Sequence, residues 1–210
     1  MTFDGAVFEA REINPWRGDR HILRDLSFSV RPGEFLKVTG PNGVGKTTLL
    51  RVICGLLPAE TGELWWRGQS VRGRRDEFNF ELGHLGHLNS LKGDLTAREN
   101  LKFLAGLRTT LTAQTIDATL DRVGILSRGD LPARSLSAGQ KRRLALARLL
   151  LADAALWILD EPVTNLDTAG IRLVEELIVD HVERGGLAIA AAHQRLLDDA
   201  PCLRRLELEP

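Results

Sequence analysis

The segment GPNGVGKTT, residues 40–48, constrains the fold more than any other part of the chain, because it satisfies the spacing G-x-x-x-x-G-K-[ST]. An apolar run, FLKVT, precedes it, and the amphipathic stretch TTLLRVICGLL follows it. Glycines let consecutive backbone N–H groups turn inward around anionic oxygens, and the N-terminal end of the following helix adds positive potential. Strand, loop and helix together predict a phosphate cradle in an α/β fold, with a chance glycine-rich turn as the alternative.

The residue types in this loop have separate expected roles. Lys46 supplies a mobile positive charge that can reach the β- and γ-phosphates of a nucleotide. The hydroxyl of Thr47 is placed to ligate Mg²⁺, which bridges phosphate oxygens in sites of this kind. The residues expected to contact the nucleotide here are Gly40, Pro41, Asn42, Gly43, Val44, Gly45, Lys46, Thr47 and Thr48.

Two adjacent carboxylates, Asp160 and Glu161, follow the apolar run LWIL. Ligands of α/β sheets gather at the carboxyl ends of such strands. Because successive residues of a strand point in different directions, the two side chains can serve different purposes. We expect Asp160 to hold Mg²⁺ through water and Glu161 to polarise an attacking water as a general base. An ordinary acidic strand end is the alternative.

The segment LSAGQ, residues 136–140, precedes the basic stretch KRRLALARLLL and predicts a second anion site. Ser137 is expected to cap a helix, and Gly139 leaves backbone N–H groups accessible at the start of that helix. The basic run 141–143 is expected to form a solvent-exposed face, with contact to phosphate or to a partner subunit as the alternative.

The composition is that of an ordinary globular protein, with 210 residues, 43% apolar, and 28 basic and 28 acidic side chains. This balance leaves no overall positive charge for non-specific binding of nucleic acid, so we expect no nucleic-acid partner. Cys54 and Cys202 lie in no metal-binding spacing and are expected to be free thiols. No signal-peptide pattern opens the chain, and Arg148 and Asp153 interrupt its most apolar stretch, residues 144–162, which predicts no membrane span.

Hydrophobic periodicity predicts strands in the first and last thirds of the chain and helices in the middle. Strands are expected at 6–13, 26–30, 34–40, 155–159 and 187–192, with a hairpin over 62–71 and an edge strand within 201–210. Helices are expected at 46–57, 96–108, 116–123, 137–151 and 169–183, and the basic segment 71–78 as a solvated hairpin or lobe edge. This pattern indicates an α/β fold with a parallel sheet and an α-helical lobe inserted at about residues 88–150.

The motifs at 40–48, 136–140 and 156–162, the later TNLD and His193 occur in the order found in ABC transporter ATPase subunits, and the resemblance covers essentially the whole chain. It implies a single P-loop NTPase domain over 1–210, an ABC nucleotide-binding domain with an antiparallel β subdomain, which binds ATP with Mg²⁺ and hydrolyses it. The family forms head-to-tail homodimers around two ATP molecules. Each ATP then lies between the phosphate loop of one copy and three residues of the other, which match Ser137, Gly139 and Gln140 here.

The resemblance also implies roles for single residues. Asp167, in TNLD, matches the position that crosses the dimer interface. His193 matches the histidine that holds the γ-phosphate and the attacking water, which completes a catalytic set with Glu161 and Lys46; a histidine capping a strand end is the alternative. Trp16 lies where the family places an aromatic side chain that stacks on adenine, with a surface or core tryptophan as the alternative.

One position departs from the family pattern. A glutamine that contacts Mg²⁺ and senses the membrane partner usually follows the third core strand, and His87 stands there in this sequence. A histidine has a different geometry and titrates near neutrality, so the metal role does not transfer directly. A metal or haem pair of His84 with His87 is the less favoured interpretation. The segment LGHLNSLKGDLTARENL is similar to the ATP-binding subunits of the cytochrome c maturation system, a haem exporter.

That similarity implies an integral membrane transporter subunit as partner and a peripheral position on the cytoplasmic face of the bacterial inner membrane. Three alternatives stay open: a related ABC exporter for drugs or polysaccharide, a soluble nucleic-acid-associated ABC ATPase, and a P-loop kinase or GTPase. The sequence lacks the tandem cassettes or coiled-coil insertions of the second class and the NKxD motif of GTPases, and LSAGQ argues against a kinase.

Overall fold

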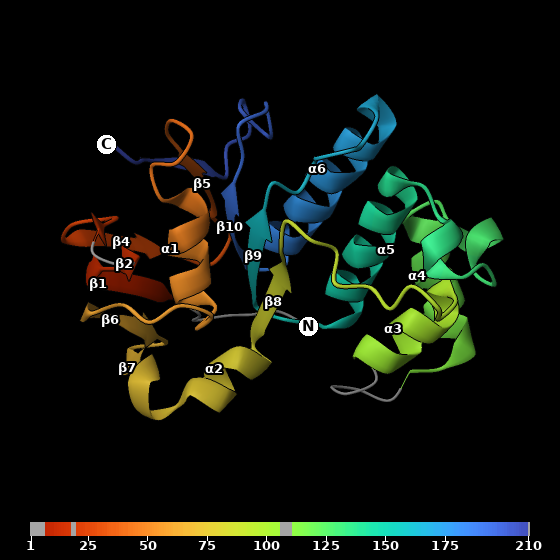
Figure 1. Cartoon of the computed structure of the whole chain (residues 1–210), viewed down its shortest axis with the longest axis horizontal. Helices are drawn as coiled ribbons and strands as arrows, with labels where there is room; N and C mark the ends of the chain where they lie inside the picture. Colours follow the sequence, from red (N-terminus) through yellow and green to blue (C-terminus); the bar gives the residue numbers. More distant parts are fainter. Residues whose placement is uncertain (1–6, 18–19, 106–110, 210) are drawn as a thin grey trace.

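Two sheets of different kinds form the framework of the molecule (Figure 1). The computed structural model describes residues 7–17, 20–105 and 111–209. In this part of the chain the strand order is β11-β5-β10-β9-β8 in one sheet and β4-β1-β6-β7 in the other, with β2 and β3 as a separate two-stranded ribbon. The predicted α/β class, with a parallel sheet and an antiparallel one, is confirmed.

The larger sheet is parallel throughout. Its strands are β5 (Phe35–Thr39), β8 (Leu82–Leu85), β9 (Leu156–Asp160), β10 (Leu187–Ala191) and β11 (Leu203–Glu207). Every residue of β9 and β10 is buried, as continuous apolar runs predict for strands covered on both faces. β11 lies at one edge of the sheet, so the predicted edge strand is confirmed.

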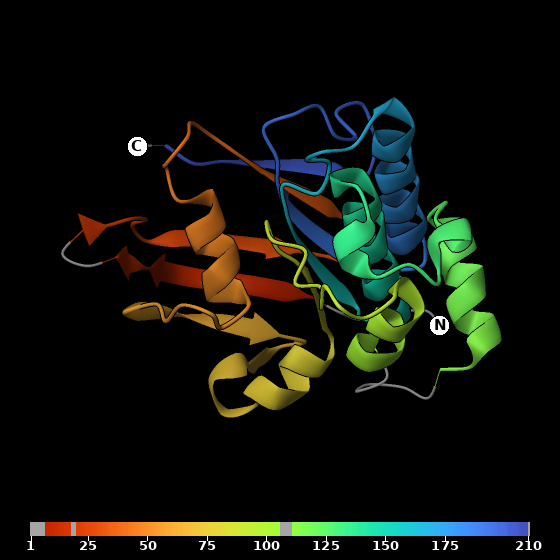
Figure 2. The same ribbon diagram turned by 45° about the vertical axis from the view of Figure 1, so that its right-hand side comes forward.

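Alternate residues of β9 face different hydrophobic cores because a strand has a period of two residues. Ile158 packs in the core that contains α1, whereas Trp157 packs in the core of α5 and α6. Figure 2 shows the antiparallel sheet and α1 on one side of the parallel strands and α5 and α6 on the other. The three helices span Lys46–Ile53 (α1), Ala138–Leu151 (α5) and Thr168–Glu183 (α6).

The antiparallel sheet packs against α1. Its strands are β1 (Phe8–Asn14), β4 (Leu26–Val30), β6 (Thr61–Trp66) and β7 (Gln69–Ser70), and the ribbon consists of β2 (Trp16–Arg17) and β3 (Arg20–His21). Phe8 and Trp66 of this sheet share one core with Leu50 of α1 and Ile158 of the parallel sheet. Helix α1, which follows the phosphate loop, is thereby held by both sheets. Residue 6 of the strand predicted at 6–13 lies outside the described residues.

Two more helices, α3 (Ala97–Ala105) and α4 (Ala113–Arg122), pack against α5. Thr96 and Glu99 form the capping box that their spacing predicts: the Thr96 N–H donates to Glu99 Oε2 at 2.8 Å, and the Glu99 N–H donates to Thr96 Oγ1 at 3.1 Å. Residues 106–108 of the helix expected over 96–108 lie outside the described part of the chain.

The expected lobe over residues 88–150 stays a prediction, as does a single domain over 1–210. Helix α5 contacts α3 and α4, and it also contacts strand β8 of the parallel sheet. Within the described ranges, no helix combines the length and the apolar character needed to cross a bilayer. Cys54 and Cys202 are free thiols, as expected.

The prediction that residues 71–78 are solvated is confirmed at residues 72–74, 76 and 77, which are exposed, but the predicted hairpin does not form there. The chain forms a short helix, α2 (Arg75–Phe80), and then strand β8, which pairs with β9. Hydrophobic periodicity did not predict β8, but the family resemblance implies a core strand just before His87, and β8 lies there. Phe78 causes the difference: it is 2% exposed and lies against the rings of Phe8 and Trp66, so this basic segment is anchored by an aromatic side chain. The contact is tertiary, and the local sequence alone does not reveal it.

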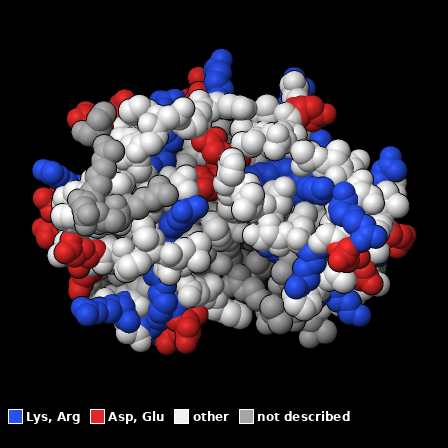
Figure 3. Space-filling model, viewed as in Figure 1, with Lys and Arg blue, Asp and Glu red and all other residues white. Residues whose placement is uncertain are grey.

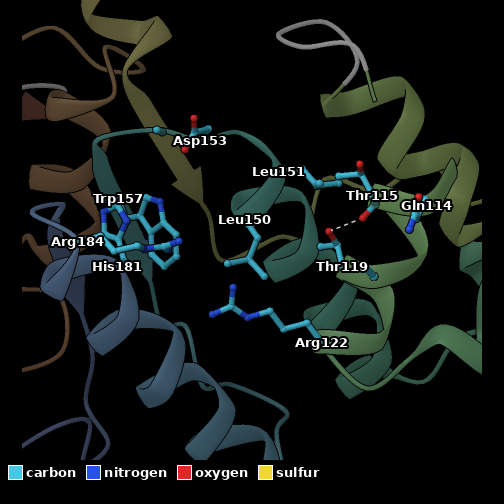
Figure 4. Close-up of a pocket in the computed structure, with 12 residues that line it drawn as sticks. Gln114, Thr115, Thr119, Arg122, Leu150, Leu151, Asp153, Trp157, His181 and Arg184 are labelled. Atoms are coloured by element: carbon cyan, nitrogen blue, oxygen red, sulfur yellow. Dashed lines mark hydrogen bonds between the residues drawn. The ribbon is translucent and has the colours of Figure 1, made fainter. Parts of the chain in front are cut away.

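The ring of His181 in α6 is buried against the indole of Trp157 in β9. The two rings are stacked with centroids 4.0 Å apart and planes 6° from parallel, and Nε2 of His181 lies 3.1 Å from the carbonyl of Leu187. Figure 4 shows both rings beside a cavity of about 570 Å³ that α4, α5 and α6 line. Burial lowers the pKa of His181 to about 4, so the ring is neutral at pH 7.

We expect His181 to make the fold sensitive to acid. An unfolded histidine takes up its proton near pH 6.5, whereas the folded one does so only near pH 4, so stability present above this window is lost as the pH falls through it. Between pH 7 and a pH of about 4.5, the free energy of unfolding should fall by about 2–3 kcal/mol more in the wild type than in His181→Gln. Urea unfolding across this pH range measures the free energy of unfolding of both proteins. The same pH dependence in the wild type and in His181→Gln would contradict the prediction.

Candidate functional site

The loop between β5 and α1 has the backbone geometry of an anion cradle. Gly40, Gly43 and Gly45 have φ angles of +134°, +82° and +119°, in the region that favours glycine. A Cβ on Gly40 would lie 2.4 Å from the carbonyl oxygen of Leu208, so only glycine fits there. A Cβ on Gly43 would meet nothing within 4 Å, which leaves space for a ligand next to the backbone.

Lys46, the first residue of α1, keeps its ammonium group within this loop. The residue is 6% exposed, and Nζ donates to the carbonyls of Gly40 at 2.8 Å and Pro41 at 2.9 Å. Burial lowers the pKa of Lys46, while the nearby carboxylates of Glu161 and Asp160 oppose that shift. The cation is therefore positioned at the loop, where phosphate oxygens can replace the carbonyls as acceptors.

Thr47 and Asp160 lie together although the sequence separates them by more than half the chain. The Thr47 hydroxyl donates to Asp160 Oδ1 at 3.1 Å, and Asp160 ends β9 with 5% of its surface exposed. One hydroxyl and one carboxylate fit Mg²⁺, which takes few protein ligands when substrate phosphates and water complete its shell. Among the described residues, no cluster of three or more His, Cys, Asp or Glu side chains forms an all-protein metal site.

Glu161 and His193 also lie side by side. Oε1 of Glu161 is 3.4 Å from Nε2 of His193, and the His193 backbone N–H approaches Oε2 at 3.5 Å. The pair is adjacent because the strands before them, β9 and β10, are neighbours with Asp160 opposite Ala191. Glu161 has a φ of +49°, which is unusual for a residue with a side chain, and its N–H donates to the carbonyl of Ala191.

The LSAGQ segment begins α5 with the expected cap. The Gln140 N–H donates to Ser137 Oγ at 3.2 Å, and the Ser137 N–H donates to Gln140 Oε1 at 2.9 Å, which together form a capping box. A Cβ on Gly139 would lie 3.0 Å from the carbonyl of Asn165, so this helix start lies beside the TNLD segment of the same chain.

Asp167 caps α6 within its own chain. Its Oδ1 accepts from the Gly170 N–H at 2.8 Å and lies 3.4 Å from a guanidinium nitrogen of Arg143, and the side chain is 75% exposed. Its expected contact across a dimer interface stays a prediction.

Trp16 is a surface residue near the phosphate loop. It is 41% exposed and stacks on His21 with centroids 4.8 Å apart. The next residue, Ile22, approaches Gly45 so closely that a Cβ there would lie 2.7 Å from its side chain. This placement excludes a core tryptophan and leaves adenine stacking and an ordinary surface residue as the two interpretations.

His87 lies in an exposed loop after β8, whereas His84 lies within that strand. Burial lowers the pKa of His84, and the nearby Arg148 adds to the shift. Both effects favour the neutral ring of His84. The metal role of the family glutamine is not assigned to His87.

Sequence reasoning missed Arg142. The basic run 141–143 was expected to be solvent-exposed, but Arg142 is 2% exposed and donates to the backbone carbonyls of Asp160 and Glu161. A signal was present, because Arg142 lies in helical phase with Ala145, Leu146 and Leu149, all of which are buried.

The surface around the site carries both signs of charge. In Figure 3, acidic side chains lie near the middle of the visible face, with Lys and Arg side chains next to them. The carboxylates of Glu161 and Asp160 oppose the lowering of the pKa of Lys46 by burial, so these opposite charges lie close together. The arrangement supports binding of an anionic ligand together with a divalent cation.

The phosphate loop, the carboxylate pair and the capped LSAGQ helix define an ATP-binding domain of the ABC class. A model of the ABC transporter family matches residues 23–164, and the chain belongs to this family. Two solved structures share the fold with a TM-score of 0.82 each. One is described as a putative ABC transporter ATP-binding protein from Pyrococcus furiosus (25% identity, 96% of this chain and 97% of that one). The other is described as an ATP-binding subunit of an ABC transporter (21% identity, 97% of this chain and 88% of that one).

Curated relatives give a narrower group, the cytochrome c biogenesis ATP-binding export protein CcmA. The protein named CcmA 2 from Cupriavidus metallidurans is 46% identical, with 91% of each chain covered. That of Dechloromonas aromatica is 43% identical over 96% of this chain and 100% of its own. That of Vibrio vulnificus is 40% identical over 96% of this chain and 99% of its own. The expected resemblance to this group is confirmed.

We expect Lys46→Met to weaken ATP binding by about 10- to 100-fold, because one charge-assisted contact to phosphate contributes about 1.5–3 kcal/mol. Isothermal titration of the full chain with Mg-ATP measures the effect. Lys102→Met is a matched control, because Lys102 lies on the exposed surface of α3. Equal ATP affinity in the wild type and Lys46→Met would contradict the placement of Lys46 at the phosphates.

Proposed function

We propose that this protein is the ATP-hydrolysing subunit of an ABC transporter for cytochrome c biogenesis, a system that exports haem. The observation that carries the proposal is the meeting of Lys46, the Thr47–Asp160 pair and Glu161 at one edge of the parallel sheet. The names of the CcmA relatives support the cytochrome c system over a drug or polysaccharide exporter. The zero formal net charge supports it over a nucleic-acid-associated ATPase.

The phosphate loop and its neighbours bind the nucleotide as the magnesium complex. Backbone N–H groups of residues 40–48 and the ammonium of Lys46 neutralise the phosphate oxygens. Thr47 would offer its hydroxyl and Asp160 its carboxylate to Mg²⁺, and the 3.1 Å hydrogen bond between them shows that the two groups lie at one place. When bound, Mg²⁺ would neutralise charge on the phosphate oxygens. Trp16 stacks on the adenine from the neighbouring ribbon.

Glu161 accepts the proton of the attacking water, and His193 positions that water and the γ-phosphate. The separation of 3.4 Å between the two side chains lets them contact one water together. Because phosphoryl transfer needs little covalent help from the protein, most of the rate enhancement comes from this positioning and from the surrounding charge.

A complete site requires two copies of the chain. The start of α5 lies beside Asn165 of its own chain, and Ser137 caps it by accepting from the Gln140 N–H. In a head-to-tail homodimer, Ser137, Gly139 and Gln140 of one copy cover the ATP bound by the phosphate loop of the other, and Asp167 lies at the interface. ATP binding closes the dimer and hydrolysis reopens it.

The closing and reopening of the dimer is transmitted to an integral membrane subunit of the same system, which makes this chain part of a translocase. The chain then lies peripherally at the cytoplasmic face of the bacterial inner membrane. Co-isolation from host membranes tests this step: a tagged chain should recover an integral membrane protein in stoichiometric amount. Recovery of the tagged chain alone would contradict it.

Glu161→Gln should keep ATP affinity within about twofold and lower turnover by about 100-fold or more, because a general base contributes 10²–10⁴ in rate. The variant should also accumulate as an ATP-bound dimer. Phosphate release and light scattering in the presence of Mg-ATP measure the two effects. Glu175→Gln, on α6, is the control, and a fully active Glu161→Gln enzyme would refute the assignment.

Ser137→Arg should leave ATP binding by the monomer within about twofold of wild type, because the phosphate contact of this segment is made to the other copy. ATP-dependent dimerisation and turnover should both be lost, since the larger side chain fills the place of the γ-phosphate. Titration, sedimentation and phosphate release test the three effects. Loss of ATP affinity in the monomer itself would show that the contact is made within one chain.

A further inference from the structure

Arg142 in α5 is a buried cation whose five N–H donors all have oxygen acceptors. Nε donates to Pro162 O at 3.0 Å, Nη1 to Gly86 O at 2.8 Å and Asn89 Oδ1 at 3.1 Å, and Nη2 to Asp160 O at 2.9 Å and Glu161 O at 2.8 Å. Burial lowers the pKa of Arg142 to about 10, so the group is still charged at neutral pH. A buried charge is tolerated only where polar groups surround it this completely.

Three of these acceptors are the consecutive carbonyls of residues 160–162, the loop that carries Glu161. Successive residues of an extended strand face opposite sides, so three neighbouring carbonyls converge on one cation only if the chain turns between them. The turn occurs at Glu161, whose φ is +49°. A left-handed conformation is unfavourable for a residue with a side chain, and the hydrogen bonds from Arg142 offset that cost.

The other two acceptors belong to the loop after β8, which contains His87. Strands β8 and β9 are neighbours, so this loop and the Glu161 loop leave the same edge of the sheet. A guanidinium is planar and rigid, and it therefore fixes the two loops relative to each other in a way that a flexible ammonium does not. Because Arg142 lies in α5, it also joins both loops to the helix that starts at Ser137.

We propose that Arg142 is a positioning residue for ATP hydrolysis: it holds the backbone of 160–162 in the conformation that places the Glu161 carboxylate beside His193, and it links that loop to residues 86–89. The proposal rests on the proposed function, because it takes Glu161 as the general base. It assigns no contact between Arg142 and the nucleotide. Its consequence is a defect in turnover without a defect in ATP affinity.

The matched control is Arg148, which lies on the same helix and donates to one carbonyl, that of His84, at 3.1 Å. In the full chain, Arg142→Lys should lower kcat by about tenfold or more, since a misplaced base forfeits part of its 10²–10⁴ contribution. Its dissociation constant for Mg-ATP should stay within about twofold of wild type, and Arg148→Lys should change kcat by less than about twofold. An Arg142→Lys enzyme with the kcat of Arg148→Lys would overturn the proposal.

Chemical rescue distinguishes positioning from general damage to the fold. Arg142→Ala leaves a cavity bounded by the carbonyls of 160–162, and guanidinium chloride at non-denaturing concentration should restore part of its kcat. Arg148→Ala should gain nothing from the same salt. Absence of rescue in a folded Arg142→Ala protein would overturn the proposal, and if that variant does not fold, the Arg142→Lys comparison decides it.

A double-mutant cycle tests the link to residues 86–89. Asn89→Ala should lower kcat in the wild type, and it should lower kcat much less when Arg142 is already Lys, because the two residues act through one group. Additive effects would overturn the link. An inactive wild type, or a fully active Glu161→Gln, would instead refute the proposed function, so the two failures are distinguishable.

Discussion

Parallel pairing of β5, β10 and β9 is the constraint on which the site depends. In the register, Val38 and Asp160 lie opposite Ala191 on either side of β10. Parallel strands end at one edge of a sheet, so the phosphate loop after β5, the carboxylates after β9 and His193 after β10 come together there. Segments far apart in the chain thus form one site because three backbones share a direction.

Buried cations hold the loops that leave this edge. Lys46 donates to the phosphate loop, and Arg142 to the loop of Glu161. Lys37, 5% exposed within β5, donates to the carbonyl of Gln194, just after His193, and to Asp198, which lowers the pKa of that carboxyl. Loops at a strand end leave backbone carbonyls without ladder partners, and a cation satisfies several of them at once.

Much of the fold was predictable because its signals are local. The glycine spacing of the phosphate loop, the buried apolar run before Asp160 and the capping boxes at Thr96 and Ser137 each depend on a few adjacent residues. The elements that hydrophobic periodicity did not predict depend on distant partners. Helix α2 depends on Phe78 packing against the antiparallel sheet, and β8 is recognisable as a strand through its pairing with β9.

The sequence by itself determined the residue types of the site and the order in which they occur, because spacing along the chain fixes which backbone N–H groups, hydroxyls and carboxylates adjoin each strand and helix. Only the tertiary structure decided which of them meet. It paired Thr47 with Asp160 and Glu161 with His193, and it buried Arg142, which the run of basic residues did not indicate. The physical reason is that sheet register and burial arise from contacts between segments distant in sequence, which local patterns do not encode.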